Sequence, residues 1–303
     1  MVKLTSQKVA IVTGSAGFIG YHVSKKLLDE GWKVIGVDCL SEYYDVSLKK
    51  KRESILKKNP MYVSINQSIQ QPGLLTKVFK KEKPEIVVHL AAQVGVRFST
   101  ENPRSYLEAN TIGTFELLDA ARNYPPKHML LASTSSVYGA NEEMPYREID
   151  RADYQMSFYA ATKKSTENMA HAYSNLFNLP ITMFRFFTVY GPWGRPDMAM
   201  FKFTKAILSG DKIDVYNFGK MKRDFTYIDD LVHAIYLLID EPPDLKGDTV
   251  TIEGNKKNKS PVAPFRVINI GNSKSEKLID FINAIEIATG LKAKKKFHAY
   301  ATG

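Results

Sequence analysis

The feature that most constrains the fold of this chain is a glycine-rich turn between an apolar run and a helical pattern. The apolar run covers residues 9–13, the helical pattern covers residues 19–30, and the turn spans residues 14–20. Glycines there permit a tight turn, close approach of a pyrophosphate and close packing of helix on strand. The helix N-terminus offers unpaired N–H groups to phosphate charge. These features predict a dinucleotide site that includes Gly14, Gly17, Phe18, Ile19 and Gly20.

Short apolar runs alternate with helical periodicity through the first two-thirds of the chain. The runs lack polar/apolar alternation, which is typical of a parallel sheet covered on both faces. The predicted strands are residues 9–13, 33–38, 61–65, 86–91, 129–133 and 181–186, and the predicted helices are residues 19–30, 48–57, 73–81, 106–122 and 159–177. This alternation predicts an α/β fold with a Rossmann-type, doubly wound parallel sheet.

The pattern loosens after Gly191, which predicts a second, smaller lobe. We expect helices over residues 201–208, 229–239 and 278–288, a strand over 266–270, and a surface loop over 244–264. The chain is therefore divided into a dinucleotide-binding domain over residues 1–180 and a discontinuous C-terminal lobe over residues 181–303. The core of the first domain is expected to extend into later segments, and the lobe is expected to bind mainly substrate.

An aspartate ends the second predicted strand. A carboxylate at this place can accept hydrogen bonds from both hydroxyls of the adenosine ribose and would repel a 2′-phosphate. Asp38 therefore favours NAD over NADP as the cofactor. The alternative is an ordinary aspartate in a turn.

Composition excludes several other classes of protein. The chain of 303 residues has a formal charge of +10, but its basic residues form short scattered clusters without a DNA-reading motif, so no nucleic-acid partner is expected. Its one cysteine, Cys39, cannot form an intramolecular disulfide, and no Cys/His pair has zinc-ligand spacing, so no metal is expected. No secretory signal and no run of about 18 apolar residues is visible, which predicts a cytoplasmic protein without a membrane partner.

A tyrosine and a lysine share one face of the helix predicted over residues 159–177. Tyr159 and Lys163 are four residues apart, so the ammonium can stabilise the phenolate. A free tyrosine titrates near pH ~10, and neighbouring Lys and NAD⁺ charges would lower that pKa. The tyrosine could then remove a hydroxyl proton as hydride leaves the same carbon. The pair is interpreted as catalytic because it follows the glycine-rich turn; alone it would be an ordinary surface pair.

These motifs resemble the extended short-chain dehydrogenase/reductase superfamily. Its nucleotide-sugar branch typically reads TGxxGFIG, which residues 13–20 match completely, and residues 89–92 and 110–114 match as well. The resemblance implies that NAD is lined further by Ser68, Ile69, Leu90, Ala91, Ala92 and Asn110. The family commonly has an Asp for the adenine where this chain has Ser68, with Asn66 nearby, so that contact departs from the pattern.

The resemblance also implies a third catalytic group at the exit of the fifth strand, in the stretch LASTSSVYG. Thr134 takes the Ser/Thr position by register, and Ser133 and Ser135 remain rivals. Sugar dehydratases of this superfamily place acidic residues after the threonine, and UDP-glucuronate decarboxylases usually read STSEVYG. This chain has Ser135 and Ser136 there instead. The lack of a carboxylate favours simple redox epimerisation.

The stretch RFFTVYGPWGRPDMA at residues 185–199 resembles the UDP-glucuronate 4-epimerase family almost letter for letter, and residues 43–49, 91–97 and 219–230 look like it too. The resemblance implies a UDP-sugar substrate, UDP-glucuronate, converted to UDP-galacturonate through a 4-keto intermediate. Thr188 and the planar fork of Arg195 could clasp the 6-carboxylate. The other expected substrate contacts are Arg97, Thr134, Ser135 and, at the diphosphate, Arg223.

Several alternatives stay open at this point. Arg195 could pair with Asp197 instead, and Arg223 with Asp224 or Asp229. The chain could also be a UDP-glucose or UDP-N-acetylglucosamine 4-epimerase, or a poorly active NAD-binding homologue. The resemblance further implies a homodimer formed through the helices at 106–122 and 159–177.

The last residues depart from the family. These epimerases normally continue with an MPMQPGDV-like segment that helps close the nucleotide-sugar site, whereas residues 298–303 read HAYATG. Codons for that stretch, read one base later, can encode MPMQPG. We therefore expect a C-terminus truncated by a reading-frame slip, with lower activity as a result.

Overall fold

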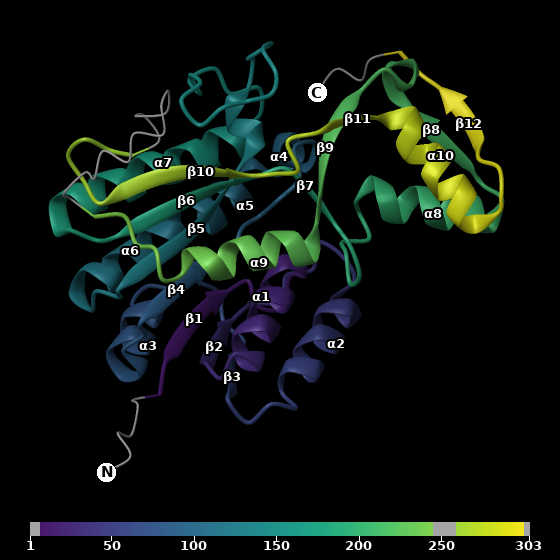
Figure 1. Ribbon diagram of the computed structural model, residues 1–303. Coiled ribbons are helices and arrows are strands. Elements are labelled where there is room, and N and C mark those ends of the chain that lie inside the picture. The colour runs from purple at the N-terminus through teal and green to yellow at the C-terminus, as the bar shows by residue number, and fades with distance from the viewer. Residues whose placement is uncertain (1–6, 245–258, 300–303) are drawn as a thin grey trace.

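The computed structural model of this protein describes residues 7–244 and 259–299 (Figure 1). At its centre is a seven-stranded sheet with the order β10-β6-β5-β4-β1-β2-β3, in which every neighbouring pair is parallel. Its strands are β1 (Val9–Thr13), β2 (Lys33–Val37), β3 (Tyr62–Ile65), β4 (Ile86–His89), β5 (His128–Thr134), β6 (Ile181–Phe186) and β10 (Phe265–Ile270). The order reverses between β1 and β4, which confirms the predicted doubly wound Rossmann-type fold.

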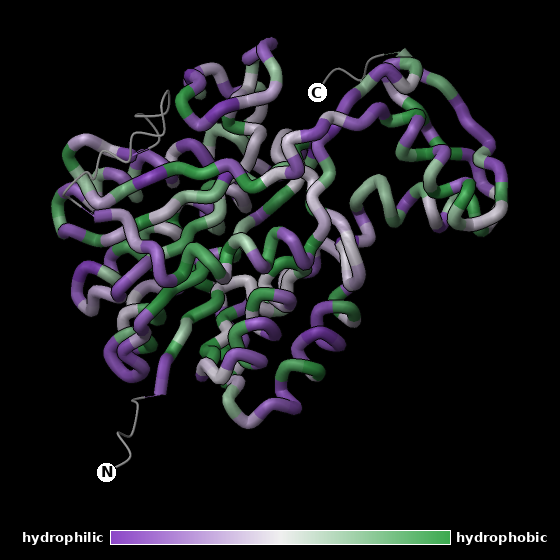
Figure 2. The backbone as a smooth tube through the Cα atoms, in the orientation of Figure 1, coloured by the Kyte–Doolittle hydropathy of each residue, from purple (hydrophilic) through white to green (hydrophobic). Residues whose placement is uncertain are grey.

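Helices cover both faces of this sheet. One face carries α1 (Phe18–Asp29), α2 (Val46–Leu56) and α9 (Ile228–Leu238), and the other carries α3 (Leu74–Glu82), α6 (Gly113–Asn123) and α7 (Phe158–Phe177). Successive residues of β1 supply the two cores in turn: Ala10 and Val12 pack on the α1 side and Ile11 on the other. Hydrophobic residues accordingly follow the strands between the helical layers (Figure 2). Burial on both faces explains why the strands read as unbroken apolar runs.

The helix predicted over residues 106–122 is interrupted. The short helices α4 (Phe98–Glu101) and α5 (Pro103–Tyr106) lead into a π-helical segment, η1 (Leu107–Ile112), after which α6 begins. Asn110 lies in this segment, fully buried, and its side chain bonds the backbone of Gln93 and the hydroxyl of Thr162. Such π-turns occur frequently at functional sites. Periodicity did not reveal the interruption because the backbone is helical on both sides of the π-segment, at Tyr106 and at Gly113.

A smaller lobe lies to the right in Figure 1. It contains α8 (Ala199–Ser209), α10 (Leu278–Thr289) and a parallel pair of strands, β8 (Lys212–Val215) and β12 (Lys294–Phe297), around a separate apolar core. A three-stranded sheet of β7 (Thr188–Tyr190), β9 (Lys222–Tyr227) and β11 (Ser275–Lys277) connects it to the main body, and η2 (Ser135–Tyr138) and η3 (Tyr216–Gly219) are short 3-10 turns. Sequence analysis missed these five strands because they are short and largely polar.

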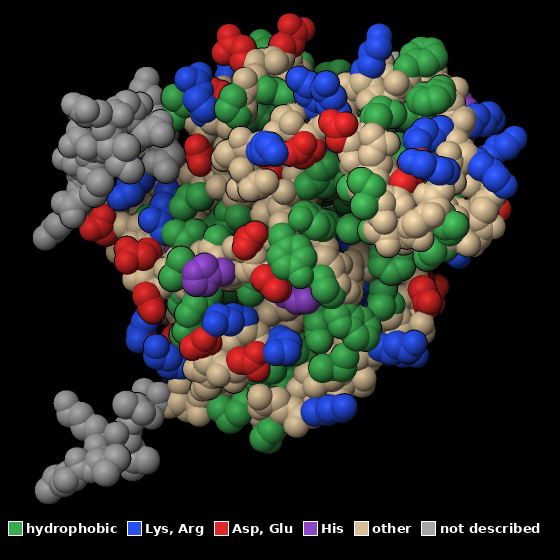
Figure 3. Space-filling model, turned by 45° about the vertical axis from the view of Figure 1, so that its right-hand side comes forward, with side chains coloured by type: hydrophobic (Ala, Val, Ile, Leu, Met, Phe, Trp, Pro, Cys, Tyr) green, Lys and Arg blue, Asp and Glu red, His purple; other side chains and the backbone are tan. Residues whose placement is uncertain are grey.

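The segments beyond residue 180 do not all belong to the small lobe. β10 is an edge strand of the main sheet, and α9 packs on α1. This arrangement accords with a core that extends into later segments, and the boundary at residue 180 stays a prediction. Lys and Arg side chains gather over the small lobe (Figure 3, upper right), where β12 carries three consecutive lysines.

Two expectations fall largely outside the described residues. They are the surface loop at 244–264, of which 245–258 are not described, and the altered C-terminus, of which 300–303 are not described. Among the helices that the structure does describe, none is long and apolar enough to cross a membrane.

Candidate functional site

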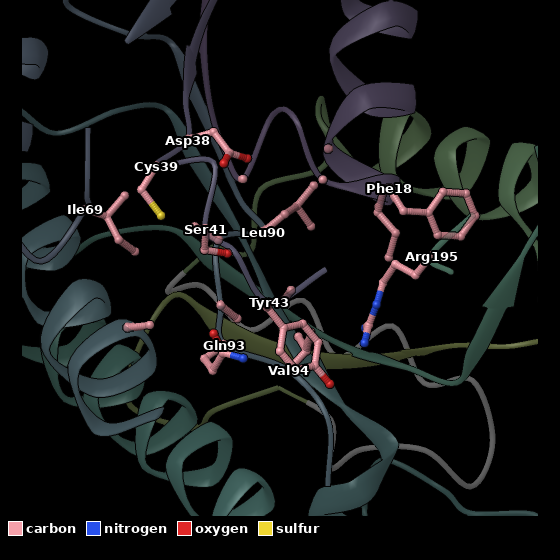
Figure 4. Close-up of a pocket in the computed structure, with 18 of the residues that line it drawn as sticks. Phe18, Asp38, Cys39, Ser41, Tyr43, Ile69, Leu90, Gln93, Val94 and Arg195 are labelled. Carbon is pink, nitrogen blue, oxygen red and sulfur yellow. The ribbon is translucent and has the colours of Figure 1, made fainter. Parts of the chain in front are cut away.

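A cavity of about 360 Å³ opens at the carboxyl edge of the main sheet, beside the reversal between β1 and β4. Ligands of open α/β sheets bind at such an edge. In Figure 4, Asp38, Cys39 and Ile69 line one side of this cavity and Arg195 lies on the opposite side. The predicted site residues that line it are Gly14, Gly17, Phe18, Ile19, Gly20, Asp38, Ser68, Ile69, Leu90, Ala91, Ala92, Thr134, Tyr159, Lys163 and Arg195.

The glycine-rich turn is fixed by its own backbone and fits an anion. Gly14 has φ +70°, in the left-handed region, and a Cβ there would lie 2.8 Å from the Ala91 nitrogen. A Cβ on Gly20 would lie 2.0 Å from the Gly14 carbonyl oxygen, so α1 packs on the turn only with glycine there. Helix α1, which is described throughout, has no side-chain cap and no acidic residue in its first turn. Its first N–H groups are therefore free to bind a pyrophosphate.

Asp38 lies at the end of β2, with both carboxylate oxygens oriented by the backbone. Its Oδ2 accepts a hydrogen bond from the Ala16 nitrogen at 3.0 Å, and its Oδ1 accepts one from the Leu40 nitrogen at 2.8 Å. Burial raises the pKa of Asp38, while these bonds and the nearby Lys49 oppose the rise. A carboxylate has about four acceptor positions. Two of them stay available for the hydroxyls of a ribose.

A buried chain of polar groups holds the wall beside the glycine-rich turn. Thr13 Oγ1 accepts hydrogen bonds from the backbone nitrogens of Leu90 and Ala91, both at 3.2 Å. Its own proton therefore goes to His89 Nδ1 at 2.7 Å, and His89 Nε2 donates to Thr114 Oγ1 at 3.1 Å. Burial lowers the pKa of His89 to about 3, so the imidazole stays neutral and this tautomer persists.

Tyr159, Lys163 and Thr134 meet in the cavity wall, the first two from α7 and the third from the end of β5. The hydroxyl of Ser157 accepts a hydrogen bond from the Ala160 nitrogen at 3.1 Å and caps α7. The cap starts the helix directly before Tyr159. One helical turn then separates the phenol from the ammonium, and both are held on the side of the cavity.

The pKa values of Tyr159 and Lys163 depend on their surroundings. Burial raises the pKa of Tyr159, while a hydrogen bond with Thr134 and the positive charge of Arg195 oppose the rise. Burial lowers the pKa of Lys163 to about 8, and the charge of Glu167 opposes that change. A lysine with this pKa is largely protonated at neutral pH. It can therefore stabilise a tyrosinate.

The structure distinguishes Thr134 from its two rivals. Ser133 also reaches the cavity, but its hydroxyl donates to Glu167 Oε1 at 2.6 Å. Ser135 begins η2 and does not line the cavity, so the expected substrate contact at this residue is not brought to the site. Thr134 Oγ1 lies beside Tyr159 and accepts a hydrogen bond from the Ser136 nitrogen at 3.2 Å. We therefore keep Thr134 as the third candidate.

A buried ion pair lies next to Tyr159, Lys163 and Thr134: Glu167 acts on the charge of Lys163 and bonds Ser133, the residue before Thr134. Glu167 and Arg185 are each 3% exposed, and Arg185 Nε and Nη2 bond the two carboxylate oxygens at 3.0 and 2.9 Å. Lys164 Nζ lies 3.1 Å from Oε2, and the Arg185 guanidinium lies over the Tyr138 ring at 4.7 Å. Sequence analysis missed Glu167. The available signal was its place four residues after Lys163.

Arg195 reaches into the cavity beside Tyr43 (Figure 4). Its Nε and Nη2 bond the carboxylate of Asp197 at 3.1 and 2.5 Å, which is the pairing that the sequence left open as an alternative. A guanidinium has five N–H donors. The Asp197 pair uses one N–H of Nε and one of Nη2, and a hydrogen bond with Tyr43 also engages the guanidinium, so the remaining N–H donors can bind a carboxylate in the cavity.

Arg97, Thr188 and Arg223, which were also predicted to contact the substrate, do not line the cavity. Arg97 is exposed, and its guanidinium lies over the Tyr216 ring of the small lobe at 4.9 Å. Thr188 begins β7 and pairs with Phe225 of β9. Arg223 is exposed on β9, where its Nη1 donates to the Lys222 carbonyl, and within the described ranges it makes no ion pair with either aspartate considered above. The pairing of β9 with β7 and β11 decides the positions of Thr188 and Arg223, and those strands were not predicted.

Asn110 also lies outside the cavity lining, and its side-chain amide is hydrogen-bonded within the protein. It accepts from the Gln93 nitrogen at 2.8 Å and donates to the Gln93 carbonyl at 3.1 Å and to Thr162 Oγ1 at 3.0 Å. It thus positions the wall of the cavity, and its contact with NAD stays a prediction. Among the lining residues that sequence analysis did not assign are Cys39, Ser41, Tyr43, Tyr44, Lys49, Gln93 and Met198. The family-like stretch at 43–49 was the available signal for three of them.

Comparison with known proteins agrees with the resemblance seen in the motifs. Residues 10–252 match the family described as the NAD dependent epimerase/dehydratase family. A probable UDP-glucuronate 4-epimerase of Rhizobium meliloti (strain 1021) is 50% identical over 283 residues, which are 93% of this chain and 83% of the relative. The structure of UDP-glucuronic acid 4-epimerase from Bacillus cereus, in complex with UDP-glucuronic acid and NAD, is 32% identical with a TM-score of 0.84, over 97% of this chain and 87% of that one. UDP-glucose 4-epimerase from Thermotoga maritima, with UDP-glucose, is 28% identical with a TM-score of 0.82, over 97% and 87%.

Proposed function

Because this chain belongs to the NAD dependent epimerase/dehydratase family, we propose that it interconverts UDP-glucuronate and UDP-galacturonate by epimerising carbon 4 of the sugar. The observation that carries this proposal is that Tyr159, Lys163 and Arg195 line one cavity. A base for the 4-hydroxyl and a guanidinium for the 6-carboxylate therefore face the same space. The relatives from Rhizobium meliloti and Bacillus cereus support this choice of substrate.

NAD fits the half of the cavity that contains the glycine-rich turn. The first N–H groups of α1 would hold its pyrophosphate, Asp38 its adenosine ribose, and Ser68 and Ile69 would border the adenine. When bound, NAD⁺ supplies the acceptor for the hydride of carbon 4 and returns that hydride within the same cycle, so the net reaction is an isomerisation.

Tyr159 acts on the proton of the sugar hydroxyl. As a phenolate it takes the 4-hydroxyl proton, and it returns a proton to that oxygen after the 4-keto sugar has turned about its diphosphate linkage. Thr134 and Arg195 both act to lower its pKa against the effect of burial. Lys163, which lines the same cavity one turn further along α7 and has a pKa of about 8, supplies positive charge that favours the phenolate.

Arg195 has a second task in this reaction. Oxidation at carbon 4 produces a β-keto acid, whose bond between carbons 5 and 6 can break with release of carbon dioxide. The electron pair of that bond forms an enolate with the 4-ketone, and the enolate takes a proton from water. The step is fast only when the breaking bond is aligned with the ketone π system. A carboxylate that the Arg195 guanidinium holds away from this alignment is protected from decarboxylation.

The test is product analysis with the purified protein and UDP-glucuronate. We expect UDP-galacturonate with little UDP-pentose. Arg195→Ala should raise the KM by about 10- to 100-fold, as expected for the loss of a charge-assisted hydrogen bond, and should increase the UDP-pentose. The matched control is Arg151→Ala, since Arg151 is an exposed arginine away from the cavity. Turnover of UDP-glucose or UDP-N-acetylglucosamine without turnover of UDP-glucuronate would contradict the proposed substrate.

We also propose a homodimer. Exposed apolar side chains lie along η1, α6 and the end of α7, and the elements pack against one another. These side chains are Leu107, Ile112, Phe115, Leu176 and Phe177. An apolar surface of this kind supports self-association through a two-fold axis. Analytical ultracentrifugation should give a dimer for the wild type and a monomer for Phe115→Glu; a monomeric wild type would contradict the proposal.

A further inference from the structure

Arg52 on α2 is a fully buried cation. Its side chain has 0% exposure and is the largest of those that are completely buried. Across residues 7–244 and 259–299, no carboxylate forms an ion pair with it. Burying a charge without a counter-ion is costly unless hydrogen bonds compensate. The positions of those hydrogen bonds therefore indicate what this residue is for.

The four terminal N–H donors of Arg52 connect three segments. Nη1 donates to the Ala16 carbonyl of the glycine-rich turn at 3.0 Å and to the hydroxyl of Tyr44 at 2.8 Å. Nη2 donates to the carbonyls of Trp193 and Gly194 at 2.5 and 3.3 Å. Its Nε is buried without a partner among the described residues. Arg52 thus ties the segment directly before Arg195 to the turn that is proposed to hold the cofactor.

The segment that Arg52 holds has an unusual backbone. Trp193 has φ +61°, which a bulky residue rarely adopts. Its ring packs against Tyr21 of α1 with the centroids 5.8 Å apart. His22 Nε2 donates to the Pro192 carbonyl at 2.9 Å. Side chains of α1 and α2 therefore both donate hydrogen bonds to the carbonyls of residues 192–194, which directly precede Arg195.

We propose that Arg52 is a positioning residue for substrate specificity: it fixes Arg195 relative to the glycine-rich turn and so determines how firmly the 6-carboxylate is held. This inference rests on the proposed function. The guanidinium is required because its planar fork reaches two backbone segments at once, whereas the ammonium of a lysine is a single point of charge. Misplacement of a binding group by about 1 Å can reduce a rate by on the order of 100-fold.

The experiment compares Arg52→Lys and Arg52→Met with the wild type and with Lys51→Met, an exposed neighbour on the same helix. Calorimetry gives the Kd of UDP-glucuronate and of UDP-glucose, which has a hydroxymethyl group in place of the carboxylate. We expect Arg52→Lys to weaken the binding of UDP-glucuronate by about tenfold and the binding of UDP-glucose by less than about twofold. During turnover the fraction of UDP-pentose should rise. Lys51→Met should match the wild type in both measurements.

Each result decides the matter. If the substitution weakens the binding of both ligands equally, or weakens the binding of neither, the inference is overturned. A merely structural role would not discriminate between the two ligands. If Arg52→Met does not fold, Arg52→Lys carries the test; failure of Arg52→Lys to unfold cooperatively would assign the residue to stability and overturn the inference as well. A wild type that turns over UDP-glucose but not UDP-glucuronate contradicts the proposed function instead. The binding comparison is independent of that outcome.

Discussion

Replacing Glu167 with Gln tests the buried network behind the proposed catalytic tyrosine. The carboxylate receives Ser133 Oγ at 2.6 Å, Arg185 Nε and Nη2 at 3.0 and 2.9 Å, and Lys164 Nζ at 3.1 Å. A carboxamide accepts only through its oxygen, and its NH2 group would face some of these donors. Arg185, which is 3% exposed, would then keep its charge without a full partner.

The expected magnitude follows from this burial. Removing one partner of a buried ion pair costs about 3–5 kcal/mol. For a chain of this length the unfolding entropy is on the order of 0.6 kcal/mol/K, so the melting temperature should fall by about 5–8 °C. The substitution also removes the negative charge that opposes the effect of burial on Lys163. The pKa of Lys163 should therefore fall further below about 8, and the neutral lysine stabilises the tyrosinate less.

Two measurements check these expectations. Thermal unfolding gives the stability, and kcat/KM from about pH 6 to about pH 9 shows the titration of Lys163. His89, the neighbouring imidazole, is neutral throughout this range. Activity should decline at a lower pH in Glu167→Gln than in the wild type, while Glu101→Gln, an exposed residue with the same change of charge, should match the wild type. An unshifted pH profile refutes the coupling to Lys163, and an unchanged melting temperature refutes the buried-pair argument.

Three further outcomes are expected. Tyr159→Phe should lower kcat by about 10²- to 10⁴-fold with the NAD content of the purified protein unchanged; loss of NAD, measured by absorbance after release, would contradict a purely chemical role. Gly14→Ala should destabilise the protein by more than about 1 kcal/mol in urea unfolding, since its Cβ would lie 2.8 Å from the Ala91 nitrogen at φ +70°; an unchanged midpoint would show that the turn tolerates a side chain. Burial lowers the pKa of His89 to about 3 and that of His128 to about 4. Because the unfolded chain binds these protons from about pH 6.5 downward, each histidine should remove about 2 kcal/mol of stability by about pH 5. His128→Gln should lessen the difference between neutral and acid unfolding by that amount, and an unaltered difference would refute the assignment.

The predictions that succeeded concern features that act over a few residues. The apolar runs of the main sheet and the helices between them were found from periodicity, because each strand is buried on both faces and each helix on one. The glycine-rich turn was found because the left-handed conformation of Gly14 and the contact at Gly20 exclude other residues locally. The placement of Asp38 and Tyr159 follows from the same short-range rules.

The predicted site residues that the structure does not place in the cavity lining are side chains whose position depends on distant segments. Arg97 and Arg223 have the right chemistry for an anionic substrate, but the packing of the small lobe takes them away from the cavity. Asn110 belongs to a matching motif, yet the π-helical turn commits its amide to Gln93 and Thr162.

The sequence by itself thus determined the sheet, its dinucleotide turn and the family, because backbone conformation and burial periodicity are local properties of the chain. Only the tertiary structure decided the environment of the reacting groups. Glu167 accepts hydrogen bonds from Arg185 and Ser133, which lie on strands far from it in sequence. Arg52 donates hydrogen bonds to the Ala16 carbonyl and to the segment before Arg195. No short-range sequence pattern predicts these side-chain contacts, because the groups come within hydrogen-bonding distance only after the sheet and its helices have packed.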